Sequence, residues 1–99
     1  MNVEESSIEE KLRQVLDPEV GLNIVDLGLL NQIRIDDRDI EIEMTLTSPV
    51  CPVGPLILEE VEATVQAEWP DHEVILSLVF DPPWTPQRIS PEGRKTLQL

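Results

Sequence analysis

The sequence predicts a single α/β (α+β) domain with the element order α-β-β-α-β-α, and three observations support this. Residues 8–16 carry apolar side chains at helical spacing. Residues 33–46 alternate between apolar and polar across a short polar turn, and a second helical segment separates this alternation from an apolar run at 74–80. A chain of 99 residues has room for one core. We therefore expect one domain over residues 1–99, built on a small three-stranded mixed sheet packed with helices.

The first helix is predicted to begin near Ser7. Ser7 and Glu10 form a capping-box pattern, in which the two side chains bond free backbone N–H groups of the first turn. Pro18 forces the preceding residue out of helical geometry and is expected to end the helix. The apolar stripe of this helix consists of Ile8, Leu12, Val15 and Leu16.

The segment 23–35 is expected to be extended and to lead into an antiparallel hairpin that turns at residues 36–39. Ile33 and Ile35 alternate with polar neighbours before the turn. After it, one face carries Ile40, Ile42, Met44 and Leu46, and the other carries Glu41, Glu43, Thr45 and Thr47. The second face is acidic, so we predict that it faces solvent.

Three prolines between residues 49 and 55 predict a loop, and a helix follows at roughly 56–68. Its inner stripe is predicted to be Leu58, Val61 and Val65. This helix joins two parallel strands, and the second strand, Val74–Phe80, is so apolar that both of its faces are expected to be covered. Ser90 before Pro91 has the pattern of an N-cap and predicts a short C-terminal helix.

The charge of the chain excludes some classes of partner. Twenty acidic residues against seven basic ones give a net charge of −13, which repels nucleic acid and anionic membrane surfaces. No apolar run approaches the roughly 20 residues of a membrane span, and the N-terminus lacks the pattern of a signal peptide. We expect a cytoplasmic protein whose partner is a basic protein face, a small molecule or a metal.

Cys51 is the main candidate for chemistry because it lies between the end of a strand and the start of a helix. A helix N-terminus lowers the pKa of a nearby thiol, whereas the acidic chain and the missing N–H groups of Pro52 and Pro55 act against a thiolate. The alternative is that Cys51 is a small buried hydrophobe. One cysteine forms no intramolecular disulfide, and it does not hold an iron–sulfur cluster alone.

Four further residues have a functional and a structural interpretation. Asp26 interrupts an apolar run, so it faces solvent, caps a local turn near Gly28, or faces a site. Thr47 either caps the second helix or lines a site with Cys51. His72 is predicted to be a solvated loop histidine, and Trp84, set between prolines, a packing lid.

Five segments in this order resemble a known family: 17–19 (DPE), 23–29 (NIVDLGL), 44–47 (MTLT), 51–52 (CP) and 81–85 (DPPWT). Together they closely resemble the iron–sulfur cluster assembly family that includes the SufT and PaaD proteins, in its minimal stand-alone form. The resemblance implies an iron–sulfur assembly-type domain that is a maturation factor and no enzyme. It also implies that Cys51 is a metal and cluster ligand, with Asp26 and Thr47 in the cofactor-binding site.

The resemblance further implies a transient iron–sulfur cluster, which two protomers of a homodimer could share through Cys51. Its implied partners are iron–sulfur assembly scaffold proteins and apo-client proteins. One alternative is an acidic protein–protein interaction module, a PaaD-like accessory of an oxygenase system, that binds no cluster directly. Another is a thiol enzyme, in which Cys51 would need His72 as its base because the chain has no other histidine.

Overall fold

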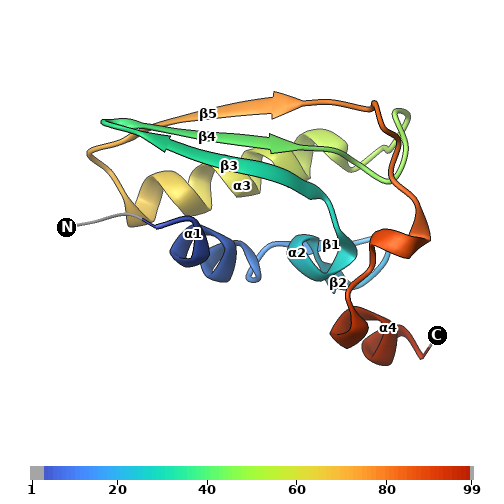
Figure 1. Cartoon of the computed structure of the whole chain (residues 1–99). Helices are drawn as coiled ribbons and strands as arrows, with labels where there is room; N and C mark the ends of the chain where they lie inside the picture. The colour runs from blue at the N-terminus through green and yellow to red at the C-terminus, as the bar shows by residue number, and fades with distance from the viewer. Residues whose placement is uncertain (1–3, 99) are drawn as a thin grey trace.

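A three-stranded sheet and the helices on one of its faces form the two layers of the molecule (Figure 1). The structure is a computed structural model, and it describes residues 4–98 of the chain. In chain order the elements are α1 (Glu5–Leu12), β1 (Leu16–Asp17), β2 (Leu22–Asn23), α2 (Ile24–Leu27), β3 (Leu30–Asp36), β4 (Asp39–Met44), α3 (Gly54–Glu68), β5 (Glu73–Leu78), the 3-10 helix η1 (Pro86–Arg88) and α4 (Pro91–Leu97).

The main sheet has the strand order β3-β4-β5, with β3 antiparallel and β5 parallel to the central strand β4. Ile33 pairs with Ile42 and Ile35 pairs with Ile40, so the hairpin has the register that the alternation predicts. The predicted three-stranded mixed sheet is therefore confirmed. A separate two-stranded pairing of β1 with β2, which no pattern in the sequence predicted, lies at residues 16–23.

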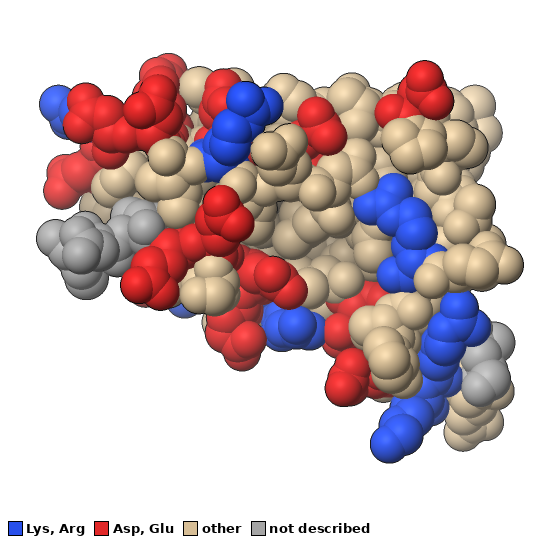
Figure 2. Space-filling view, viewed as in Figure 1, with Lys and Arg blue, Asp and Glu red and all other residues tan. Residues whose placement is uncertain are grey.

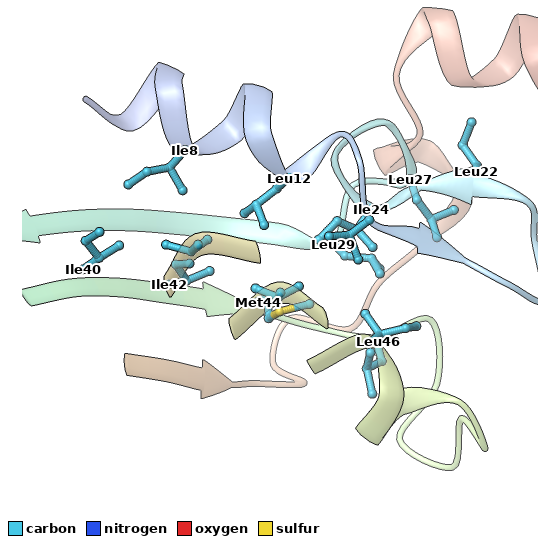
Figure 3. Packing of buried hydrophobic residues seen from close by; sticks show 14 of the residues in the cluster. Ile8, Leu12, Leu22, Ile24, Leu27, Leu29, Ile40, Ile42, Met44 and Leu46 are labelled. Atoms are coloured by element: carbon cyan, nitrogen blue, oxygen red, sulfur yellow. The ribbon is translucent and has the colours of Figure 1, made fainter. Parts of the chain in front are cut away.

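The core lies between the sheet and the two long helices. Ile40, Ile42 and Met44 of β4 are fully buried, while the glutamates between them are half-exposed on the other face. Figure 3 shows Ile8 and Leu12 of α1 pointing toward the same interior. Period-two alternation in β4 thus decides which face of the sheet the helices cover.

The first helix differs from the prediction at both ends. It begins at Glu5, and its N-cap, Glu4, makes no side-chain hydrogen bond. The prediction of a capping box formed by Ser7 and Glu10 was therefore wrong. It ends at Leu12, because the chain then enters β1, where Leu16 pairs with Asn23. Leu16 therefore leaves the apolar stripe and is 52% exposed.

A helical turn, α2, replaces part of the extended segment expected at 23–35. The side chain of Asn23 accepts a hydrogen bond from the backbone N–H of Asp26 at 2.9 Å, which caps the turn. Gly28 ends it with φ +84°, a left-handed conformation that favours glycine. Asn23 and Gly28 are typical capping residues, but the apolar residues between them led to the prediction of an extended segment.

The last strand is covered on one face only, which corrects the expectation of two covered faces. It is an edge strand, and the side chains of Val74 and Leu76 are half-buried whereas that of Ile75 is 36% exposed. No helix of the described chain lies over the outer face of the sheet, where Ile75 stands beside Glu41 (Figure 1). An apolar run therefore did not indicate double burial here.

The second helix begins at Gly54, two residues before the predicted start, with Pro55 in its first turn. Its buried side chains are Ile57, Val61 and Val65, while the predicted Leu58 is only half-buried. The predicted loop before it is confirmed, and no helix in residues 4–98 is long and apolar enough to cross a membrane.

The C-terminal segment is fastened to α2. The side chain of Ser90 accepts from the backbone N–H of Gly93 at 3.0 Å, so the predicted N-cap is confirmed. The indole N–H of Trp84 donates to the carbonyl of Leu27 at 2.7 Å, and its ring packs on the core as the predicted lid. Lys and Arg side chains follow this segment, whereas carboxylates gather over the hairpin turn and α1 (Figure 2).

Candidate functional site

Cys51 lies half-buried in a turn between β4 and α3 that backbone hydrogen bonds hold in place. Its N–H donates to the carbonyl of Ser48 at 3.2 Å, and its own carbonyl accepts from the N–H of Gly54 at 3.2 Å. The hydroxyl oxygen of Ser48 also accepts from the N–H of Val50 at 3.2 Å. These bonds hold the backbone of Cys51 in a defined turn just before α3.

Gly54 brings the start of the helix close to the loop. A Cβ at this position would lie 2.7 Å from Cδ1 of Leu46 and 3.9 Å from Cβ of Cys51. A side chain there would displace the terminal methyl group of Leu46, so glycine allows α3 to begin close to the end of β4 without that change.

Glu19 is the side chain that meets the thiol. The Cys51 Sγ donates to Oε1 of Glu19 at 3.7 Å, across 32 residues of sequence. The buried carboxylate of Asp17 stabilises the backbone at Glu19, because its Oδ1 accepts a hydrogen bond from the N–H of Glu19 at 2.9 Å. The turn between β1 and β2 therefore presents a carboxylate to the cysteine loop.

These surroundings raise the pKa of the Cys51 thiol above its ordinary value. Burial is the largest cause, and the N–H of Val53 opposes it by stabilising the thiolate. The charges of Asp17 and Glu19, together with the hydrogen bond to Glu19, raise the pKa further. The lowering expected from the helix N-terminus does not prevail, so Cys51 at rest is a protonated thiol.

Replacing the carboxylate next to the sulfur tests this cause directly. Glu19→Gln removes the negative charge that opposes the thiolate, so we expect a lower pKa of the Cys51 thiol than in the wild type. The rate of alkylation by iodoacetamide as a function of pH measures that pKa. Glu43→Gln makes the same charge change on the outer face of the sheet and should leave the profile unchanged. Equal profiles for Glu19→Gln and wild type would remove Glu19 from the site.

Asp26 lies in α2, where its carboxylate bonds three protein side chains. Oδ2 accepts from the Asn23 amide at 2.7 Å, and Oδ1 accepts from Ser90 Oγ at 2.8 Å and from the guanidinium of Arg13 at 2.8 Å. These donors, with Asn23 first, hold the pKa of the Asp26 carboxyl below its ordinary value. The carboxylate thus joins α1, α2 and the start of α4.

Thr47 lies half-buried in the loop after β4, four residues before Cys51. The turn that leads to the cysteine is made by its neighbour Ser48, and α3 is preceded by Val53 as its N-cap. Thr47 therefore does not cap the second helix, which leaves lining of the Cys51 loop as its predicted role.

His72 lies at the opposite end of α3 from Cys51. Its side chain is half-buried with an unpartnered Nδ1, which differs from the expected solvated histidine. Cys51 precedes the first residue of α3 and His72 follows the last, and a helix of 15 residues is about 22 Å long. His72 therefore cannot act as a base for Cys51, which removes the thiol-enzyme alternative in its Cys–His form.

Among residues 4–98, no group of three or more His, Cys, Asp and Glu side chains is arranged to hold a metal ion. The cysteine loop offers one thiol with the carboxylates of Glu19 and Asp17 beside it. The two acidic residues belong to the DPE segment of the family resemblance, but no sequence pattern assigned them to the site. Their place in that segment was the feature from which a role could have been predicted.

The chain is similar in sequence to a known family and to curated proteins. A family described as "Iron-sulfur cluster assembly protein" matches residues 5–76. The Fe-S protein maturation auxiliary factor SufT of Staphylococcus aureus is 44% identical over 78 residues, which cover 77% of this chain and 88% of the relative. The Fe-S protein maturation auxiliary factor YitW of Bacillus subtilis is 41% identical over 81 residues, which cover 80% of this chain and 78% of the relative.

Two solved structures share the fold. A domain of unknown function from Bacillus anthracis aligns with a TM-score of 0.90 and 32% identity, covering 96% of this chain and 92% of that one. A Mycobacterium tuberculosis protein described as associated with Fe-S complex assembly and repair aligns with a TM-score of 0.51 and 35% identity, covering 94% and 82% of the two chains.

Proposed function

The chain belongs to the iron–sulfur cluster assembly protein family, and from this premise we propose that it is a SufT-like auxiliary factor that matures iron–sulfur proteins through Cys51. One observation carries the proposal. The single thiol of the chain is held half-buried in a rigid loop, 3.7 Å from the carboxylate of Glu19. Thiolates are the soft ligands that iron–sulfur clusters require.

The raised pKa of the Cys51 thiol makes cluster binding depend on pH. Iron binds the thiolate, so the Cys51 proton must leave when the Fe–S bond forms. Glu19 Oε1, which already accepts the S–H hydrogen bond, is the nearest acceptor for that proton. The apo site thus keeps a neutral thiol, and cargo binding strengthens as the pH rises. Thiolates also exchange with other thiols, which suits a site that passes its cargo on.

Cys51 supplies one ligand, and clusters generally take four. We propose that the others come from outside this chain: from an assembly scaffold protein, an apo-client protein or Cys51 of a second protomer. The cluster is then cargo held transiently between two molecules. Thr47 lines the loop in this proposal, and Asp26 acts on the site by positioning α2 against the DPE turn, since β2 joins the two.

Moving the thiol tests the proposal. After anaerobic incubation with iron and sulfide, we expect a visible charge-transfer band and stimulated activation of an apo-target by the wild type. We expect Cys51→Ser to lose both. The matched control is Cys51→Ser with Ser77→Cys, which keeps one thiol per chain but places it at an exposed site on the outer face of the sheet.

This control keeps the number of thiols constant, so it tests whether the position of the thiol in the loop matters. If the relocated thiol supports the band and the activation as well as Cys51 does, the loop has no special role and the proposal fails. It also fails if wild-type protein stays colourless and activates nothing. Melting temperatures equal within a few degrees would show that the variants are folded.

The open face of the sheet favours a second candidate, the acidic interaction module. Five carboxylates lie on or beside this face, which no described helix covers: Asp36, Asp39, Glu41, Glu43 and Glu73. Docking of a basic partner there would weaken steeply with salt and survive Cys51→Ser. Binding that is insensitive to salt, or that is lost with Cys51, would contradict this candidate.

A further inference from the structure

A groove of about 240 Å³ lies between β1 and the first turns of α3, next to the cysteine loop. Apolar side chains from both elements form most of its walls. The lining residues are Gln14, Leu16, Pro18, Leu56, Ile57 and Glu60.

The groove is lined by the same two segments of the chain that continue to the thiol. Pro18 lines the groove, and the next residue, Glu19, accepts the hydrogen bond of the Cys51 thiol. On the other side, Leu56 follows closely after Gly54, where a Cβ would lie 3.9 Å from Cβ of Cys51. A molecule seated in the groove would therefore contact residues that are one or two positions from those around the thiol.

The described chain exposes five large apolar side chains, and two of them line this groove. Leu16 is 52% exposed and Leu56 is 55% exposed. Val50, adjacent to Cys51 in sequence, is 84% exposed. The remaining two, Ile75 and Leu78, lie on the edge strand β5. Exposed apolar side chains that line one groove together mark a site of interaction.

Both leucines are turned toward solvent. Leu16 stands one residue after the buried Val15 and points away from the core, because α1 ends at Leu12. Leu56 stands beside the buried Ile57 and is also turned outward. Their exposed apolar surface is free to contact another molecule at the groove that both line.

Charge decides between the possible occupants. Glu60 lines the groove, and Glu19 and Asp17 lie beside it, so the surroundings are acidic. A second copy of the chain would bring like carboxylates together, and each copy carries a net charge of −13. A segment with Lys or Arg beside an apolar side chain complements both the walls and the rim.

We propose that this groove docks a segment of a partner protein in which an apolar anchor is flanked by lysine or arginine. Docking there brings the partner to the two chain segments that continue into the Cys51 loop and the DPE turn. This inference rests on the proposed function, because the partner is the scaffold or client with which the cargo is exchanged. The docking step itself needs no metal.

A synthetic peptide with a central leucine pair, flanked on each side by two lysines, tests the groove on the full chain. We expect saturable ¹⁵N amide shifts at residues 16–19 and 54–60. The double variant Leu16→Ser/Leu56→Ser should bind the peptide at least about tenfold more weakly, because burial of the two leucines is lost. Both side chains are already exposed, so we expect the variant to fold.

The chain provides a matched control in Ile75→Ser/Leu78→Ser, which removes the other exposed apolar pair and should leave peptide binding unchanged. Equal binding of a peptide with glutamates in place of lysines, shifts centred on β5, or no saturable binding would overturn the proposal. Dimers in sedimentation that Leu16→Ser/Leu56→Ser abolishes would also overturn it in favour of a second copy.

Cys51→Ser separates this inference from the proposed function. The variant should bind the peptide as the wild type does while losing the iron–sulfur band. If the wild type binds the peptide but forms no iron–sulfur band and activates no client, the docking groove is supported and the proposed function is contradicted. If Leu16→Ser/Leu56→Ser leaves both the iron–sulfur band and client activation unchanged at limiting client concentration, the docking groove is contradicted while the proposed function is retained.

Discussion

Gly28→Ala is expected to destabilise the protein by about 3–5 kcal/mol. Gly28 has φ +84°, and a Cβ there would lie 2.7 Å from Cβ of Arg88 and would also collide with the carbonyl group of that residue. The backbone of η1 must then move away from α2. The free energy of unfolding in urea measures the loss.

The chain contains its own control for this prediction. Gly21 has nearly the same conformation, φ +80°, but a Cβ there would meet nothing within 4 Å. Gly21→Ala therefore isolates the backbone strain and should cost only about 1 kcal/mol. If the two substitutions cost the same, the contact with Arg88 contributes nothing and the C-terminal segment is not fastened at Gly28.

Asp26→Ala is expected to cost about 3 kcal/mol, because it leaves the donors of Asn23, Ser90 and Arg13 without their common acceptor. The side chain of Asp26 is only 13% exposed, so water does not replace it fully. Ser90 also donates its backbone N–H to the carbonyl of Asp26 at 2.8 Å, and its hydroxyl caps α4. Loss of the carboxylate should therefore loosen α4, which amide hydrogen exchange can detect.

The pH dependence of this loss follows from the lowered pKa of Asp26. A carboxylate whose pKa is lower in the folded state stabilises the fold fully above its unfolded-state pKa of about 3.9. That stabilisation disappears as the pH falls through the lower folded-state value. The difference in unfolding free energy between wild type and Asp26→Asn should thus be constant near neutral pH and shrink in acid.

Asp36→Asn serves as the control, because Asp36 is exposed and lies across from another carboxylate, Asp39, at the hairpin turn. We expect a change within about 0.5 kcal/mol. If Asp26→Asn costs no more than Asp36→Asn at neutral pH, the three hydrogen bonds of Asp26 do not support the fold. Its part in the site would then have to be direct.

These two positions explain how the C-terminal segment contributes to the site. Asp26 lies in α2 and Gly28 is its C-cap, and they contact α4 and η1 respectively. β2 and the DPE turn directly precede α2, so α2 is connected to Glu19 through a short stretch of chain. We therefore expect damage at Gly28 to reach the thiol through the turn.

The sequence by itself determined the elements whose signal is local. Alternation over residues 33–46 predicted the hairpin and its buried face, because side chains in a strand point to opposite sides in turn. Prolines marked the cysteine loop, and Ser90 marked the start of the last helix, because both restrict backbone geometry within a few residues. The family resemblance rested on such local segments and was confirmed.

Only the tertiary structure decided the features that depend on distant partners. The contact of Cys51 with Glu19 joins residues 32 positions apart, and no local pattern encodes which carboxylate meets the sulfur. The direction of the thiol pKa, which opposing sequence features left open, is decided by burial first and then by the nearby charges of Asp17 and Glu19, which together outweigh the helix N-terminus. Leu16 was predicted to be buried by its helical spacing, but the pairing of β1 with β2 ended the helix and turned it outward. Periodicity states which residues share a face of one element, whereas packing between elements decides whether that face is covered.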